Sequence, residues 1–324
     1  MTRPNSDFES AEQMLERYFD ATRPPVIEDR AILHPARLDA FPDSRRNAHG
    51  YRSDEFTQRA KLNIAFIGCS WTEGDGVARQ EIFPDLVKLH LSDALGVSVN
   101  SWNFGQSATG MDYAARILPA VCALRPDIVV LVLSGPDRRE FFSADGKRMV
   151  FSNSLANLLR RNPGALDNDL ACDPGVIRGF GALQSPHQDL ANYILGARAI
   201  TNQLALARID WLYSCVDAPA AVKMMQMARD FGALPMEKDL THIFEKRDRA
   251  SDTNPHPGIE SHARFATLLS AAILDRLPRR DTQGGSRPGL AHRIGGFFGS
   301  RATGAGRSTP GATTQEDDDI YPLW

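Results

Sequence analysis

Short apolar runs alternate with longer segments of helical periodicity from Leu62 to Leu277, and this alternation constrains the fold more than any other feature. The apolar runs are typical of buried strands, and the segments between them repeat apolar residues every three or four positions, as helices do. A strand, a helix and a second strand in this order predict a parallel βαβ unit with a right-handed crossover. The sequence therefore predicts an α/β domain built on a parallel sheet.

The predicted elements follow one another without an internal repeat. The predicted strands are residues 62–68, 97–105, 127–134 and 210–216. The predicted helices are residues 80–96, 111–125, 187–209, 219–232 and 259–277.

The composition of the sequence changes on either side of this domain, which we place at residues 61–277. Residues 1–60 form an N-terminal extension, expected to pack on the domain and to contain one amphipathic helix at about residues 10–21. A polar insertion covers about residues 143–186. Residues 278–324 are rich in Gly, Ser, Thr, Arg and Pro, and we expect a disordered tail because such a composition cannot form a packed core.

The overall composition excludes several classes of function. In 324 residues, 42% are hydrophobic, which suffices for a full core, and the net charge of -3 gives no general attraction to nucleic acid or an anionic membrane. No stretch approaches the roughly 18 apolar residues of a membrane-spanning helix, and the N-terminus lacks the apolar core of a signal peptide. The four cysteines show no CxxC spacing. We therefore expect a cytoplasmic protein without a disulfide framework, a zinc site or a membrane partner.

The tail contains two different patterns. Its arginines alternate with glycine rather than with aromatic residues, which favours a solvated linker over a nucleic-acid-binding arm. The final stretch, EDDDIYPLW, places aliphatic and aromatic side chains after an acidic run, as short docking peptides do. It predicts either a protein partner for the tail or a C-terminus that folds back on its own domain.

Small and polar residues follow the predicted strands, at the edge where parallel sheets bind ligands. The first strand ends in Gly68, Cys69 and Ser70, and the second ends near Asn103 and Gly105. A free backbone N–H at such a turn can stabilise developing negative charge, and glycine lets a substrate approach it closely. The glycines thus leave room around the hydroxyl of Ser70.

A serine hydroxyl becomes a nucleophile when a histidine takes its proton, and a carboxylate or carbonyl commonly orients that histidine. Of the eight histidines, His256 stands in a proline-stiffened loop, SDTNPHPG, just before the last predicted helix. Asp252 lies four residues upstream of it. These residues are candidates for a catalytic base and its orienting group.

Three sequence blocks resemble those of the SGNH/GDSL hydrolases: IGCSWTEGDG, NFGQSATG and DTNPHPG, in the same order along the chain. The resemblance spans about residues 62–277 and implies a three-layer α/β/α sandwich of flavodoxin-like type, with about five parallel strands. It implies Ser70 as nucleophile, His256 as general base and Asp252 as the group that orients it. The N–H groups of Ser70 and Gly105 would stabilise the oxyanion, with Asn103 beside them. Such a site needs neither a metal nor an organic cofactor.

The sequence departs from the family pattern in two places. The third block, G-x-N-D, is here Gly135-Pro136-Asp137 after Ser134, and proline has no donor to replace the asparagine. Arg138 is the nearest candidate for that oxyanion or substrate-binding role, although it could instead form a salt bridge with Glu140 or Asp137.

The second departure concerns the orienting group. The family has D-x-x-H, and Asp252 is one residue farther from His256. Pro255 could accommodate the additional residue, or a backbone carbonyl could orient the imidazole instead.

Each candidate also has a structural interpretation. Ser70 could cap the N-terminus of a helix, and His256 could be a loop histidine bonded to the backbone. Asp252 could be a turn residue, and Gly105 could be glycine because a tight turn requires it. A phosphate-binding loop at GCSWTEGDG is disfavoured, since the segment lacks both G-x-G-x-x-G spacing and a P-loop lysine.

Together the motifs predict a serine esterase that removes an O-acetyl or other short acyl group from a small-molecule or carbohydrate ester. The alternative is a catalytically weak or inactive domain of the same fold that binds a partner, for example through its tail. Loss of the third-block asparagine supports the alternative.

Overall fold

The structure is a computed structural model of the full chain. It describes residues 46–56, 59–142, 148–151, 179, 181–182 and 184–277. The chain divides into two units, Met1–Arg280 and Asp281–Trp324, and the second lies wholly outside the described residues. The predicted helix at residues 10–21, most of the insertion and the predicted tail with its terminal aromatic residues also lie outside them.

The core of the fold is a parallel sheet of strand order β2-β1-β3-β6. Its strands are β1 (Leu62–Gly68), β2 (Val99–Gly105), β3 (Ile128–Leu133) and β6 (Asp210–Cys215). Parallel bridges from Tyr213 to Asp239 and from Val216 to Phe244 extend the sheet beyond β6. The described residues thus confirm the predicted parallel sheet, with a fifth segment that pairs only at isolated positions.

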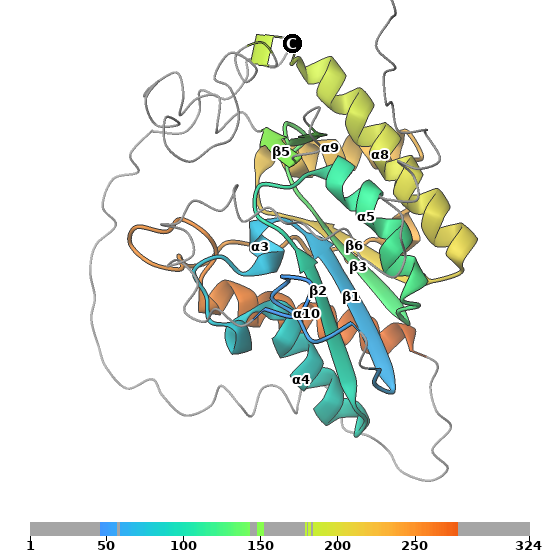
Figure 1. Ribbon diagram of the computed structural model, residues 1–324, viewed down its shortest axis with the longest axis vertical. Helices are drawn as coiled ribbons and strands as arrows, with labels where there is room; N and C mark the ends of the chain where they lie inside the picture. Colours follow the sequence, from blue (N-terminus) through green and yellow to red (C-terminus); the bar gives the residue numbers. More distant parts are fainter. Residues whose placement is uncertain are drawn as a thin grey trace, which may run out of the picture. The chain divides into compact units, whose positions relative to one another are not determined.

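Helices cover both faces of this sheet, as Figure 1 shows. The helices are α3 (Ser70–Glu73), α4 (Phe83–Leu95), α5 (Met111–Ala123), α8 (Pro186–Ala207), α9 (Pro219–Asp230) and α10 (Ile259–Arg276). Helices α4 and α10 pack together on one face, and α5, α8 and α9 form the layer on the other. This arrangement is the three-layer α/β/α sandwich that the resemblance implied.

The predicted elements agree with the structure to within a few residues, and the largest difference has a local cause. Helix α4 begins at Phe83 rather than at residue 80, after a short 3-10 turn at Arg79–Glu81. Pro84 stands in the first turn of α4, where its missing N–H costs no helical hydrogen bond. Proline therefore marks the true start of the helix.

Residues 46–56 pack on the sheet domain, as expected for the end of the N-terminal extension. Tyr51 and Phe56 are buried, and the ring of Phe56 stacks on Phe104 of β2 with centroids 4.4 Å apart. Arg52 is also buried and reaches the loop after α3. This segment therefore belongs to the support of the strand ends.

A two-stranded antiparallel sheet follows β3, which the sequence did not predict. It consists of β4 (Arg139–Phe142) and β5 (Arg148–Phe151). Arg139 is buried and donates to Asp189 of α8 at 2.8 Å, so this hairpin is tied to the helix layer. The first strand of this sheet thus precedes the predicted insertion at residues 143–186, and the second lies inside it.

Two further observations concern the helices and the cysteines of the described part of the chain. None of its helices is both long and apolar enough to cross a bilayer. Cys69, Cys122 and Cys215 are buried free thiols, consistent with cysteines that serve as small apolar residues.

Candidate active site

Ser70 and His256 meet at the carboxyl end of the sheet although 186 positions separate them in sequence. Ser70 is the first residue of α3, directly after β1, and His256 lies in the loop before α10. The Ser70 Oγ lies 2.9 Å from His256 Nε2, which is hydrogen-bonding distance. The structure thus brings together the two side chains that the motifs predict as nucleophile and base.

The interpretation of Ser70 as a helix N-cap is wrong. Cys69, in an extended conformation, occupies the N-cap position of α3, and its side chain makes no capping hydrogen bond. Ser70 is one residue farther on and its hydroxyl contacts the imidazole instead. The Ser70 hydroxyl is therefore positioned to contact His256, and it does not cap the helix.

The structure does not bring Asp252 to the imidazole, which corrects the expectation for the third residue. Asp252 is exposed, and no hydrogen bond or ion pair joins it to His256. The Nδ1 atom of His256 faces Asn254 Oδ1 at 2.7 Å, with Asp75 Oδ2 at 3.7 Å. The cause is a local turn, because Asn254 Oδ1 also accepts the backbone N–H of His256 and so lies directly beside the ring.

Gly105 and Asn103 are also placed differently from the expectation. The Gly105 N–H donates to Asn103 Oδ1 at 2.8 Å, and Asn103 Nδ2 donates to the carbonyl of Thr72 in α3 at 2.9 Å. A Cβ on Gly105 would lie 2.3 Å from the backbone nitrogen of Glu73. These two residues thus hold α3 against β2, and the Gly105 amide is not free to bind an oxyanion.

The backbone amides of Ser70 and Ala108 are among those at the strand ends that make no hydrogen bond within the described residues. Ala108 has a φ of +63°, an unusual conformation for a residue with a side chain. Its loop is fixed by Glu73, whose Oε2 accepts both the amide and the hydroxyl of Ser107 at 2.8 Å. Because the Gly105 amide is already bonded and the Ala108 amide is not, Ala108 replaces Gly105 as the candidate partner of the Ser70 amide in stabilising an oxyanion.

Arg138 has a buried donor with no acceptor. Its Nη1 makes no hydrogen bond with the described residues. Glu140, which the sequence offered as an ion-pair partner, instead binds Arg116, with Nη2 2.7 Å from Oε1. No ion pair joins Arg138 to Asp137 either, within the described set. Because a buried donor without an acceptor is costly, Arg138 remains a candidate for binding a substrate oxygen through its Nη1.

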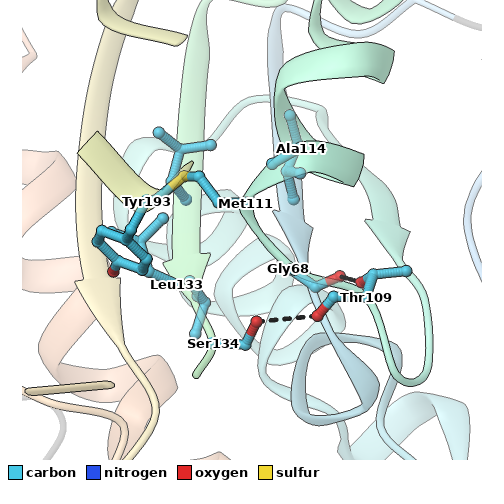
Figure 2. Close-up of a pocket in the computed structure, with 11 residues that line it drawn as sticks. Gly68, Thr109, Met111, Ala114, Leu133, Ser134 and Tyr193 are labelled. Atoms are coloured by element: carbon cyan, nitrogen blue, oxygen red, sulfur yellow. Dashed lines mark hydrogen bonds between the residues drawn. The ribbon is translucent and has the colours of Figure 1, made fainter. Parts of the chain in front are cut away.

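A small cavity lies between the ends of β1 and β3 and the start of α5 (Figure 2). Met111, Leu133 and Tyr193 line it, and Ser134 Oγ donates to the carbonyl of Thr109 at its edge at 2.8 Å. Its volume of about 10 Å³ is near the space of a single water molecule. This cavity is therefore too small to hold a substrate.

The described residues also show whether the site could hold a metal ion. No three or more His, Cys, Asp or Glu side chains among them are grouped to hold one. At Ser70 the structure instead shows a hydroxyl within hydrogen-bonding distance of an imidazole.

Sequence reasoning missed two residues beside His256, Asn254 and Asp75, and the unpaired amide of Ala108. Asn254 was visible as the residue two before His256, the spacing at which an Asn side chain bonds a backbone N–H. Asp75 gave a weaker signal, an acid between Gly74 and Gly76 after the nucleophile, and no spacing rule connects it to a loop far along the chain.

Comparisons with known proteins give likenesses of structure only. No family model and no curated protein matches the chain. A solved protein from Desulfitobacterium hafniense, described as lipolytic and of the G-D-S-L family, is 11% identical; the match covers 65% of this chain and 98% of that one, with a TM-score of 0.37.

Two further solved structures are described as esterases. EstA from Pseudoalteromonas sp. is 14% identical, over 67% of this chain and 99% of that one, with a TM-score of 0.41. Axe2, an acetyl xylan esterase from Geobacillus stearothermophilus, is 15% identical, over 67% and 94%, with a TM-score of 0.35. Of these three solved structures, one is described as a lipolytic protein of the G-D-S-L family and two as esterases. At such low identities and TM-scores the likeness assigns no activity to this chain.

Proposed function

We propose that this protein is a serine esterase in which Ser70 is the nucleophile and His256 the general base. The observation that carries the proposal is the 2.9 Å contact between Ser70 Oγ and His256 Nε2. A hydroxyl and an imidazole at this distance form the reactive pair of acyl-transfer enzymes, and the contact joins two segments that lie 186 positions apart in the sequence.

In the proposed reaction Ser70 Oγ bonds to the carbonyl carbon of the ester while its proton moves to His256 Nε2. The amides of Ser70 and Ala108 donate to the oxyanion. As the tetrahedral intermediate collapses, the bond between carbon and leaving oxygen breaks, and that oxygen takes the proton from Nε2. A water molecule then attacks the acyl-enzyme by the same path, and the acid and free Ser70 are released.

The substrate we propose is an ester of a short acyl group, such as an O-acetyl group on a carbohydrate. The sequence blocks that resemble SGNH/GDSL hydrolases support this class. The buried, unpaired Nη1 of Arg138 offers a donor for an oxygen of the substrate near the strand ends.

The first prediction concerns Ser70. A fluorophosphonate probe should label the wild type and not Ser70→Ala, because the probe reacts only with an activated serine. Hydrolysis of short-chain aryl esters and acetylated sugars should fall by at least about 1,000-fold in the same variant. Intact-mass spectrometry and initial rates measure the two effects.

Ser92→Ala, on the remote helix α4, is the matched control and should keep both labelling and activity. Equal labelling of Ser70→Ala and wild type would show that another serine reacts. A wild type that is neither labelled nor active would exclude the esterase and favour the binding domain.

A further inference from the structure

The hydrogen bonds of Asn254 place the proton on His256. The Asn254 atom beside the ring accepts the His256 backbone N–H at 3.1 Å, so it is the carbonyl oxygen Oδ1. The other amide atom, Nδ2, donates to Asp75 Oδ1 at 3.1 Å, since a carboxylate only accepts. Oδ1 carries no hydrogen, so His256 Nδ1 must donate across the 2.7 Å contact. The neutral imidazole therefore directs the lone pair of Nε2 toward Ser70.

The amide of Asn254 orients the ring but carries no charge. The nearest negative charge is the carboxylate of Asp75, whose Oδ2 lies 3.7 Å from Nδ1. Asp75 is only 4% exposed, so water screens this interaction weakly. An anion at this distance stabilises the imidazolium that forms when Nε2 accepts the Ser70 proton.

We propose that Asp75 and Asn254 together replace the single aspartate of a Ser-His-Asp triad, Asn254 by orienting His256 and Asp75 by supplying the charge. Both are positioning residues, because neither contacts the reacting atoms. This inference rests on the proposed esterase function and assigns the part of the site that Asp252 does not fill.

The loop that carries Asp75 is built to hold it in place. The buried guanidinium of Arg52 donates to the carbonyls of Glu73, Gly74 and Val77, at 3.0, 2.7 and 2.8 Å. Gly76 has a φ of +82°, and a Cβ there would lie 2.4 Å from Asn254 Nδ2. Glycine at this position thus permits the contact between Asn254 and Asp75, and Arg52 fixes the backbone on either side.

The other ionisable groups around His256 keep the same charge over the pH range in which His256 titrates. Burial acts to raise the pKa of Asp248, but hydrogen bonds from the start of α10 outweigh it and hold the pKa below its ordinary value. Burial lowers the pKa of His262 to about 3, so that ring stays neutral. Lys246 donates to the carbonyl of Pro255, and Asp252 is exposed, which leaves Asp75 as the buried anion at the ring.

The test is a titration of the His256 ring by NMR, which requires no catalysis. Asp75→Asn keeps the side-chain size and removes the charge, so the pKa of His256 should fall by about one to three units. Asp252→Asn makes the same chemical change at an exposed position and should leave the pKa of His256 within about 0.3 units of the wild type. An unchanged pKa of His256 in Asp75→Asn, or an equal fall in Asp252→Asn, overturns the proposal.

Enzyme kinetics give a second readout. In Asp75→Asn, kcat should fall by at least about 10-fold with little change in KM, because Asp75 does not contact the substrate. The lower limb of the pH profile of kcat/KM should move to lower pH with the pKa of His256. If the pKa of His256 shifts in Asp75→Asn but the wild type hydrolyses no ester, the role of Asp75 stands and only the proposed esterase function is refuted.

Asn254→Ala tests the orienting role separately. Loss of the Oδ1 acceptor should move part of the neutral His256 population from the Nδ1–H to the Nε2–H tautomer, which ¹⁵N chemical shifts distinguish. An Nε2–H ring cannot accept the Ser70 proton, so labelling of Ser70 should slow in parallel. A tautomer population identical to the wild type would contradict the role given to Asn254.

Discussion

At the scale of single residues, His262 is a buried polar side chain that lacks one hydrogen-bond partner among the described residues. His262 is fully buried, its ring is stacked on Phe83, and its Nδ1 accepts the Phe83 amide at 3.1 Å. That amide belongs to the first turn of α4, where backbone donors lack helical acceptors. Because Nδ1 accepts, the proton is on Nε2, which finds no partner among the described residues. His262 thus caps α4 in its neutral form.

The second prediction follows from this burial, which lowers the pKa of His262 from 6.5 to about 3. Below pH 6.5 the unfolded chain binds a proton at this residue and the folded chain does not, so folding stability is lost as the pH falls. From pH 7.5 to pH 5 this contributes a loss of about 2 kcal/mol in the free energy of unfolding. Urea unfolding should show a smaller loss in His262→Asn.

His242→Asn is the control, since that histidine is exposed. It should keep the pH dependence of the wild type. If His262→Asn and the wild type lose the same stability over this pH range, the neutral buried ring is not the cause.

At the scale of elements, the short helix α3 is held from several directions, which explains how four residues can form a stable support for Ser70. Asn103 of β2 binds the carbonyl of Thr72, and Glu73 binds the loop that follows β2. Gly68 and Gly105 are paired neighbours at the ends of β1 and β2, so the segments that follow these two strands begin side by side at the same edge of the sheet. The helix depends on these contacts rather than on its own length.

The third prediction concerns the contact between α3 and β2. Gly105→Ala places a Cβ 2.3 Å from the backbone of Glu73, so the helix must move. Stability should fall by about 2 to 3 kcal/mol, and fluorophosphonate labelling of Ser70 should be lost. Gly96→Ala, where a Cβ meets nothing within 4 Å but φ is +65°, should cost about 1 kcal/mol and keep the labelling. Wild-type labelling in Gly105→Ala would contradict this account.

At the scale of the whole described domain, a buried ion pair joins the start of β4 to the helix layer. Arg139 Nη2 lies 2.8 Å from Asp189 Oδ1 in α8, and Arg139 Nη1 donates to the carbonyls of Pro136 and Arg138. Burial raises the pKa of Asp189, although Gln184 and Arg139 act to lower it. The pair therefore ties the position of the Pro136–Arg139 segment to α8.

The fourth prediction tests the ion pair between Arg139 and Asp189. Arg139→Met leaves Asp189 buried without its cation and should cost about 3 kcal/mol or more in urea unfolding at pH 7.5. The loss should be smaller at pH 5, because the unpaired carboxyl can then take a proton. The double variant Arg139→Met with Asp189→Leu should be more stable than Arg139→Met alone. A double variant that loses the sum of both single losses would show that the pair is not coupled.

The sequence by itself determined the alternation of strands and helices, the parallel sheet, and the two side chains Ser70 and His256. These follow from periodicity and from short motifs, which depend on neighbours a few residues apart. The hairpin at Arg139–Phe151 was missed because its strands are short and lie beside an insertion without clear periodicity.

Only the tertiary structure decided which groups surround the imidazole and which amides are free. Asn254 rather than Asp252 lies beside His256, and Asp75 comes from a loop 179 positions away from Asn254. Gly105 supports α3, and the amide of Ala108 is left unpaired. The physical reason is that hydrogen bonds act over about 3 Å in space, whereas sequence motifs record only spacing along the chain.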